Sequence, residues 1–388
     1  MKIFVLLSRV PYPLEKGDKL RAYHQLRHLA KDNEIFLCCL SDTAIDKEAV
    51  DHLRQFVQHV EVIKLSFPAV LWQLFLGMFS RLPYQVHYFY QRQAERKIDR
   101  MIKRFAPDHI YCQLIRTTEY VKNLHHFPKT LDYMDALNAG LLRRIPTAKW
   151  WMRGFVREEA KRLVSYEHLI FDYFDHHSII SKQDQQFIYH PDREKIAIIP
   201  NGVDTDFFSP IPSDKKYDLV FTGNMNYTPN IEGAKRLALE ILPLIQKEIP
   251  NANVLIAGAD PSEEVKTLAS SSVHISGWIS DIRDAYSSSR IFVAPMVIGS
   301  GMQNKLLEAM SMTLPCVTTS LAAVPLEAMH QQELWISETN EEIANGCIFL
   351  LKNSIDATEL GLRGRTFVTQ KFNWQKTIIQ LNKLMTSK

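Results

Sequence analysis

RIFVAPMVIGSGMQNKLLEAMSMTLPCVTTS, residues 290–320, is the stretch that decides the fold. It opens with an apolar run that ends at Pro295, passes through a loop containing Gly301, and continues as a helical pattern carrying Lys305 and Glu308. The apolar run predicts a buried strand, and the helix start offers unpaired backbone N–H groups and a positive dipole end. A phosphate suits this place, because glycine lets the backbone approach and Lys305 adds positive charge. The alternative is a capped helix with surface charges.

The same alternation of strand, loop and helix runs through the whole chain. In the first half, apolar runs at 3–8 and 34–41 alternate with helical patterns at 21–31 and 47–56. The second half repeats the alternation after a connector rich in turn residues, 196–210. We therefore expect an α/β protein with two doubly wound parallel sheets, whose ligands bind at the C-terminal ends of the strands.

Charge is distributed unevenly between the two halves. The chain has 388 residues with 46 Lys plus Arg and 43 Asp plus Glu, which is too balanced for a typical nucleic-acid binder. Residues 1–200 hold 30 basic and 23 acidic residues, whereas the remainder holds 16 basic and 20 acidic residues. This asymmetry favours two domains with different partners, of which the first suits an anionic surface or substrate.

Cysteine usage and hydropathy favour a cytoplasmic protein. The five cysteines include no C-x-x-C pair and no spacing with histidine that suits zinc. The longest apolar stretch, 65–79, is too short as a helix to cross a hydrocarbon core of about 30 Å.

Segment 67–97 is both aromatic and basic. The favoured interpretation is a core helix followed by a loop. The alternative is peripheral contact with an anionic membrane, in which Trp72, Phe75, Phe79 and Arg81 lie at the level of the lipid headgroups.

The chain resembles the retaining GT-B glycosyltransferases of family 4. The LEAM run at 307–310 and the preceding Gly301 resemble the donor-nucleotide motif of that family, and Pro315, Cys316 and Val317 resemble the strand that follows it. Four further matches occur in order along the chain: IPNGVDTDFF at 199–208, FTGNMNYTPN at 221–230, NVLIAGA at 253–259 and GW at 277–278.

The resemblance implies a GT-B fold with two Rossmann-like domains facing a central cleft. The expected parts are an acceptor-binding domain over 1–198, a nucleotide-sugar donor domain over 199–370, and a terminal helix over 371–388 that crosses back to the first domain.

The resemblance also implies a donor site. Glu308 would hold the ribose hydroxyls and Lys305 the diphosphate, while core packing is an equal alternative for Trp278. The donor-binding residues that follow from the resemblance are Gly17, Gly223, Asn224, Gly277, Trp278, Ser300, Gly301, Met302, Lys305 and Glu308.

Two departures from the family pattern concern this site. Ser300 stands where the family commonly has a glutamate, and 221–230 lacks the Arg and Lys pair that many members use to hold the diphosphate. A basic residue three positions before the glutamate, here Lys305, resembles a subgroup linked to bacterial exopolysaccharide synthesis.

Retaining transfer in this family needs no dedicated base, because the leaving diphosphate can take the acceptor proton. We expect Asp135 and Lys305 to be catalytic, although Asp135 is equally suited to capping a helix. The acceptor-binding candidates are Lys19, Arg21, Asp132 and Asn138. Asp18 matches a helix N-cap. Many members place a histidine near the reacting sugar, and His87, His125 and His126 are all candidates for it here, although a lone histidine is more often structural.

The predicted function is transfer of a sugar from a nucleoside-diphosphate donor to a glycan or lipid-linked acceptor in bacterial cell-surface polysaccharide synthesis. We expect no cofactor and no metal, because the D-x-D at Asp204 and Asp206 lies in the connector. The alternatives are a non-catalytic GT-B homologue acting as a partner subunit and a nucleotide-sugar 2-epimerase. A Rossmann dehydrogenase is disfavoured, since no G-x-G-x-x-G follows the first strand.

Overall fold

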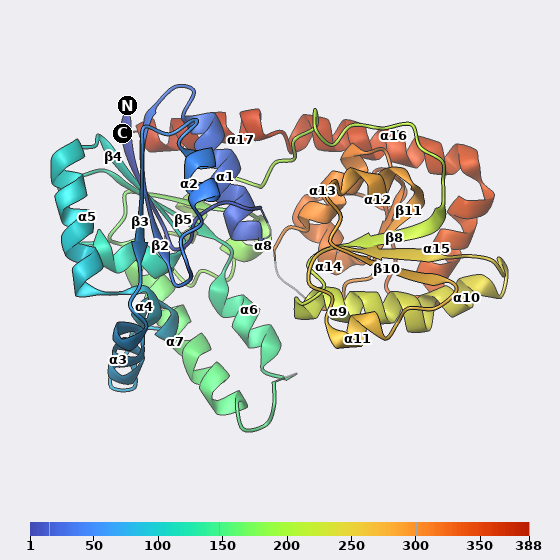
Figure 1. The fold of residues 1–388 in the computed structure, drawn as a ribbon, viewed down its shortest axis with the longest axis horizontal. Helices are drawn as coiled ribbons and strands as arrows, with labels where there is room; N and C mark the ends of the chain where they lie inside the picture. The colour runs from blue at the N-terminus through green and yellow to red at the C-terminus, as the bar shows by residue number, and fades with distance from the viewer. Residues whose placement is uncertain (15, 147, 299–300, 388) are drawn as a thin grey trace. The chain divides into compact units, whose positions relative to one another are not determined.

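The computed structural model describes residues 1–14, 16–146, 148–298 and 301–387 (Figure 1). The chain forms two compact units, of which unit 1 comprises Met1–Pro200 with Trp374–Lys388 and unit 2 comprises Asn201–Asn373. Both divisions fall within a few residues of the domain limits expected from the sequence. The roles expected for the two domains remain predictions.

Unit 1 contains a seven-stranded sheet with the order β3-β2-β1-β4-β5-β6-β7, and each adjacent pair is parallel. Its strands are β1 (Lys2–Leu7), β2 (Glu34–Ser41), β3 (His59–Lys64), β4 (His109–Gln113), β5 (Lys129–Met134), β6 (His176–Ile179) and β7 (Ala197–Ile198).

Helices connect these strands. They are α1 (Gly17–Leu29), α2 (Lys47–Leu53), α3 (Phe67–Gly77), α4 (Tyr84–Phe89), α5 (Arg92–Phe105), η1 (Ile115–Tyr120), α6 (Leu137–Arg144), α7 (Arg153–Phe171), α8 (Lys182–Gln185), η2 (Arg193–Lys195) and the terminal α17 (Trp374–Thr386).

Unit 2 contains a six-stranded parallel sheet with the order β10-β9-β8-β11-β12-β13. Its strands are β8 (Tyr217–Thr222), β9 (Val254–Ala257), β10 (Val273–Gly277), β11 (Ser289–Ala294), β12 (Cys316–Thr318) and β13 (Trp335–Ile336). Its helices are α9 (Thr228–Lys235), the π-helical η3 (Arg236–Ile241), α10 (Leu242–Gln246), α11 (Glu263–Lys266), α12 (Arg283–Ser287), α13 (Asn304–Ser311), α14 (Ser320–Ala323), η4 (Val324–Leu326), α15 (Asn340–Lys352) and α16 (Ser354–Lys371).

The alternation of side chains along β1 explains the layered core of unit 1. Phe4 and Leu6 belong to one apolar cluster, whereas Ile3, Val5 and Leu7 belong to the other. Successive residues of a strand point to opposite faces, so a continuous apolar run indicates a strand covered on both faces. This is why the apolar run at 3–8 forms a central strand.

The terminal helix α17 packs within unit 1. Ile378, Leu381 and Met385 are buried in the same apolar cluster as Leu26 of α1. The chain therefore returns to its first unit after completing the second.

Segment 67–97 differs from the favoured interpretation. It forms α3, α4 and the first part of α5 rather than one core helix and a loop. Most of α3 is exposed, with only Val70 and Gly77 buried, so the prediction of a core helix is wrong for α3. Within the described residues, no helix combines the length and apolar character that crossing a membrane requires.

Candidate functional site

Two glycines lie at the C-terminal ends of neighbouring strands in unit 2. Gly223 follows β8 with a φ of +153°, and Gly258 follows β9 with a φ of +140°. A Cβ atom placed on Gly258 would lie 1.8 Å from the carbonyl oxygen of Gly223, so a larger residue does not fit there. The two loops consequently present bare backbone at the edge where parallel sheets bind ligands. Gly223 was predicted, whereas Gly258 was missed although it lies in the quoted run 253–259.

Lys305 on α13 faces the Gly223 loop. A Cβ on Gly223 would lie 3.2 Å from Lys305 Nζ. Lys305 Nζ donates a hydrogen bond to Asn230 Oδ1, and Asn230 Nδ2 donates to the carbonyl of Asn224 at 2.8 Å. The same ammonium group lies 4.5 Å from the centre of the Phe221 ring. The structure therefore brings together Lys305, Gly223 and Asn224, and it adds Asn230, which the sequence did not single out.

The surroundings of Lys305 make its charge sensitive to pH. Burial lowers the pKa of Lys305 to about 7, and the negative charge of Glu308 opposes that shift. Near neutral pH the side chain is therefore close to half protonated. A bound anion such as a diphosphate would favour the charged form, because an adjacent opposite charge raises the pKa of an amine.

Glu308 lies one turn after Lys305 on α13. Its Oε2 atom accepts a hydrogen bond from the Tyr286 hydroxyl at 2.7 Å, and that hydroxyl also contacts Thr222 Oγ1 at 2.9 Å. Burial raises the pKa of Glu308, while the hydrogen bond from Tyr286 and the positive charge of Lys305 partly oppose this rise. Tyr286 thus fixes the orientation of the carboxylate on the half-buried face of the helix.

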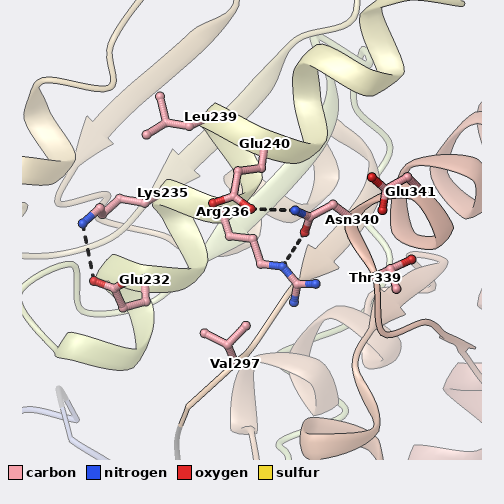
Figure 2. Close-up of a pocket in the computed structure, with 9 residues that line it drawn as sticks. All are labelled: Glu232, Lys235, Arg236, Leu239, Glu240, Val297, Thr339, Asn340 and Glu341. Atoms are coloured by element: carbon pink, nitrogen blue, oxygen red, sulfur yellow. Dashed lines mark hydrogen bonds and ion pairs between the residues drawn. The ribbon is translucent and has the colours of Figure 1, made fainter. Parts of the chain in front are cut away.

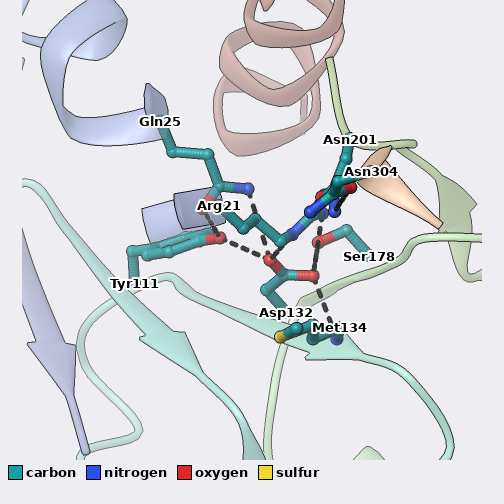
Figure 3. Close-up of polar contacts among 8 residues, drawn as sticks. All are labelled: Arg21, Gln25, Tyr111, Asp132, Met134, Ser178, Asn201 and Asn304. Atoms are coloured by element: carbon teal, nitrogen blue, oxygen red, sulfur yellow. Dashed lines mark hydrogen bonds and ion pairs between the residues drawn. The ribbon is translucent and has the colours of Figure 1, made fainter. Parts of the chain in front are cut away.

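The start of α13 is tied to the connector that precedes β8. Asn201 Nδ2 donates to Asn304 Oδ1 at 3.0 Å (Figure 3). Gly301 has a φ of +73°, and a Cβ there would have no neighbour within 4 Å. The Met302 side chain is buried, so only its backbone can face a ligand. Ser300 lies outside the described residues.

Gly277 and Trp278 occupy the end of β10. Gly277 has a φ of +67°, and its carbonyl accepts a hydrogen bond from the N–H of Gly258 at 3.0 Å. The Trp278 side chain is 69% exposed, so the alternative of core packing is wrong. The ring is free to cover a flat ligand, and contact with a base remains a prediction.

Arg21 and Asp132, both proposed to bind the acceptor, instead form an ion pair in unit 1 (Figure 3). Arg21 Nε lies 2.6 Å from Asp132 Oδ2, and Arg21 Nη2 lies 3.1 Å from Asp132 Oδ1. Four further groups contact the carboxylate: Gln25 Nε2, Tyr111 OH, Ser178 Oγ and the backbone N–H of Met134.

The electrostatics of the pair indicate a structural role. Burial opposes ionisation of both groups, but their mutual attraction and hydrogen bonds outweigh it, so the pKa of Arg21 is raised and that of Asp132 is lowered. The carboxylate has no capacity left for an acceptor hydroxyl. We therefore correct the assignment of Arg21 and Asp132 from acceptor binding to stabilisation of unit 1.

Asn138 is also a structural residue. Its Nδ2 atom donates to Glu167 Oε2 and to the carbonyl of Phe187 at 2.9 Å, and its side chain is fully buried. Burial raises the pKa of Glu167 to about 8, although hydrogen bonds from Asn138 oppose the shift. The predicted contact between Asn138 and an acceptor is therefore wrong.

Asp135 occupies the C-terminal end of β5 among other charged groups. Burial, reinforced by the charge of Asp184, raises the pKa of Asp135 to about 7, while Arg116 opposes the shift. The N-cap of α6 is Ala136, which excludes the capping alternative for Asp135. Burial also lowers the pKa of Arg116. Asp135 is thus a titratable carboxyl at the ligand-binding edge of the sheet, and its catalytic role remains a prediction.

The start of α1 differs from the expected cap. Lys16 occupies the N-cap position, and Asp18 pairs with Arg9 at 2.9 Å, so the N-cap assignment for Asp18 is wrong. Gly17 begins the helix, and a Cβ there would make only an ordinary contact. Donor binding by Gly17 and acceptor binding by Lys19 remain predictions.

A separate cavity of about 620 Å³ lies between α9, η3 and the start of α15 (Figure 2). Arg236 Nε donates to Asn340 Oδ1 at 2.6 Å, and Asn340 Nδ2 donates to Glu240 Oε2 at 2.6 Å. These polar groups satisfy one another, and none of the predicted donor residues lines the cavity. A donor site at the strand ends of unit 2 remains a prediction, and this cavity lies outside it.

Among the described residues, no group of three or more His, Cys, Asp and Glu side chains is arranged to hold a metal ion. Asp204 Oδ1 accepts a hydrogen bond from the backbone N–H of Phe207, which makes it part of a local turn. The absence of a metal requirement remains a prediction.

Comparisons with known proteins match these features. Residues 216–353 match the family described as Glycosyl transferases group 1. A 44.6 kDa protein in the cps region of Klebsiella pneumoniae is 24% identical over 412 residues, covering 98% of this chain and 99% of that protein.

Solved structures share the fold. Sucrose-phosphate synthase from Thermosynechococcus elongatus superposes with a TM-score of 0.70 at 15% identity, covering 99% of this chain and 98% of the other. HepE of Anabaena, in complex with UDP and glucose, superposes with a TM-score of 0.70 at 14% identity, covering 99% of both chains.

The solved structures confirm the GT-B fold that the resemblance implies, and the family match supports a glycosyltransferase. The match to the group 1 glycosyltransferases covers residues 216–353, which lie in unit 2.

Proposed function

We propose that the protein is a retaining, GT4-like glycosyltransferase that uses a nucleoside-diphosphate sugar. The observation that carries this proposal is the convergence of the Gly223 and Gly258 loops with Lys305 and Glu308 at one edge of the unit 2 sheet. Bare backbone, a helix N-terminus and a cation together suit a diphosphate. A fixed carboxylate one helical turn away suits the ribose hydroxyls.

Different groups of the protein are assigned different roles in the transfer reaction. Protonated Lys305 and the backbone around Gly301 stabilise the negative charge that develops on the leaving diphosphate. Glu308 holds the ribose, so that the donor adopts one orientation. Because this charge develops as the glycosidic bond to the diphosphate breaks, contacts to the leaving group act mainly on the transition state.

Retention follows when the acceptor attacks the face from which the diphosphate departs. The acceptor hydroxyl forms the new bond to the anomeric carbon, the bond from that carbon to the diphosphate oxygen breaks, and the released diphosphate takes the acceptor proton. Asp135 would orient the acceptor hydroxyl, because it follows the C-terminal end of β5, the edge at which parallel sheets bind ligands.

We further propose a glycan or lipid-linked acceptor and a role in bacterial cell-surface polysaccharide synthesis in the cytoplasm. Support comes from the cps-region relative in Klebsiella pneumoniae and from the excess of basic residues in the first half of the chain. The excess of basic residues fits an acceptor that carries negative charge.

A donor screen with the full-length protein tests the proposal. UDP-, GDP-, ADP- and TDP-sugars are incubated with and without glycan acceptors, and the anomeric configuration of the product is determined by NMR. Transfer or slow hydrolysis with retained configuration supports the proposal. An inverted product contradicts retention, an epimerised donor indicates a 2-epimerase, and binding without turnover indicates a non-catalytic partner subunit.

A further inference from the structure

Helix α3 exposes an uncharged aromatic face. The helix contains no acidic or basic residue, and its outward positions are apolar. Surface helices of soluble proteins normally direct polar side chains outward. The exposed side chains of α3 and the turn that follows it are Phe67, Leu71, Trp72, Phe75, Leu76, Met78 and Phe79.

A second exposed apolar group lies at the start of α7. Trp150 is 82% exposed and is followed by Trp151, Met152 and Phe155, which are also exposed. Two adjacent exposed tryptophans leave a large apolar area in water, which monomeric proteins rarely do without a binding role. We call these residues, together with the exposed residues of α3, the apolar face.

Direct contacts hold the two parts of the apolar face next to each other within unit 1. Arg162 Nη1 of α7 donates to the carbonyl of Gly77, the last residue of α3, at 2.7 Å. The ring centres of Tyr84 and Phe155 lie 5.0 Å apart, and the Arg162 guanidinium lies 4.7 Å from the centre of the Tyr84 ring. In Figure 1, α3 and the start of α7 extend beyond the same edge of the sheet.

All charged side chains in these two segments are basic. Arg81 is the one charged residue of segment 66–84, and segment 145–157 contains Lys149, Arg153 and Arg157 without any acidic residue. All four basic side chains are exposed. The apolar face is therefore flanked along the chain by four basic side chains, and the exposed carboxylate that follows them, Glu158, is paired with Arg162.

We propose that the apolar face docks on the surface of an anionic lipid bilayer. Trp72, Phe75, Trp150 and Trp151 would enter the headgroup region, where amphipathic aromatic rings are favoured, and the basic residues would contact lipid phosphates. None of these residues belongs to the donor site, so the proposal stands independently of the proposed function.

Charge complementarity favours a lipid surface over a second copy of the chain. In a twofold interface the same patch meets itself, so four cations would face the same four cations. An anionic bilayer instead attracts all four, and its acyl chains accept the aromatic rings.

Vesicle flotation of the full-length protein tests the proposal. Vesicles of phosphatidylcholine with about a third phosphatidylglycerol are compared with vesicles of phosphatidylcholine alone. We expect selective binding to the anionic vesicles and release by high salt. Each of the double variants Arg153→Glu/Arg157→Glu and Trp150→Ala/Trp151→Ala is expected to lower the partition coefficient about tenfold.

Matched variants elsewhere in unit 1 serve as controls. Arg96→Glu/Lys103→Glu makes the same charge change on exposed positions of α5, and Ile379→Ala truncates an exposed apolar residue of α17. Both should bind vesicles as the wild type does. All substituted side chains are exposed, and circular dichroism verifies that each variant is folded.

Three results would overturn the proposal. These are absence of wild-type binding to anionic vesicles, equal loss of binding in the controls, and equal binding to both vesicle types. Light scattering adds a fourth: a wild-type dimer that becomes monomeric in Trp150→Ala/Trp151→Ala would assign the apolar face to a second copy of the chain.

Discussion

Replacement of Asp132 by asparagine tests whether this residue stabilises unit 1 or binds the acceptor. The substitution keeps the size of the side chain but removes the negative charge beside Arg21, and both side chains are fully buried. Removing one partner of a buried ion pair typically costs about 3–5 kcal/mol, because the other charge stays desolvated. At about 2–4 °C per kcal/mol for a domain of this size, a loss of about 3 kcal/mol lowers the melting temperature of unit 1 by roughly 6–12 °C.

Thermal unfolding monitored by circular dichroism and differential scanning calorimetry measures this loss. Asp51→Asn is the matched control, since Asp51 pairs with Arg54 on the surface, where ion pairs contribute little. Tyr111→Phe removes one hydrogen bond to Asp132 and should cost about 1 kcal/mol. A normal melting temperature for Asp132→Asn combined with a raised KM for the acceptor would refute the structural assignment and restore acceptor binding.

Three further predictions follow from the strand-end residues. Burial lowers the pKa of Lys305 to about 7, so the charged form of Lys305 is lost as pH rises. The affinity of the wild type for a UDP-sugar, measured by calorimetry, should therefore fall about tenfold from pH 6 to pH 8.5. An affinity that does not change with pH, or an equal fall in Lys305→Met, would contradict this prediction. Gly258→Ala should destabilise unit 2 by about 4 kcal/mol or more in thermal unfolding, because the added Cβ would lie 1.8 Å from the carbonyl oxygen of Gly223. The control Gly154→Ala places a Cβ in open space on α7 and should be neutral or stabilising. Equal melting temperatures for the two variants would refute the argument. Burial raises the pKa of Asp135 to about 7, so the fraction of its carboxylate form increases from pH 6 to pH 8, and kcat of the wild type should rise over that range. Asp135→Asn should lose this pH dependence and have about a tenfold lower kcat. A pH–rate profile that is the same in Asp135→Asn as in the wild type would remove Asp135 from the mechanism.

The local pattern of the sequence was sufficient to predict the fold. The runs 3–8 and 34–41 are apolar at successive positions, and such runs indicate strands buried on both faces, as β1 and β2 are. Alternation with helical patterns then fixes parallel sheets, because consecutive parallel strands need a crossover. Helix ends were less accurate: the helical pattern expected over 21–31 corresponds to α1, which spans Gly17–Leu29.

The buried polar network of unit 1 could not be predicted in the same way. Arg21 and Asp132 are 111 residues apart in the sequence, and only the packing of α1 against the sheet brings them together. Polar residues near strand ends have the same local pattern whether they bind a ligand or one another. The assignment of Arg21, Asp132 and Asn138 to acceptor binding failed for this reason.

The apolar run in α3 shows a related limit. Hydropathy identifies Phe67, Trp72 and Phe79 as apolar but gives no information on whether another element covers them. Gly258 was overlooked for a similar reason, since its need for glycine arises from a carbonyl oxygen on a neighbouring loop.

Nucleotide binding by Glu308→Ala tests the central claim most directly. UDP, GDP and ADP are titrated into the wild type by calorimetry, and the tightest of the three is then titrated into Glu308→Ala and into Glu263→Ala, which removes an exposed carboxylate of unit 2. Hydrogen bonds to a charged group contribute about 1.5–3 kcal/mol, so the dissociation constant should rise roughly tenfold or more in Glu308→Ala and stay unchanged in Glu263→Ala. Equal affinities for the wild type and Glu308→Ala, or no binding of any nucleotide to the wild type, would contradict the donor site placed at the strand ends of unit 2.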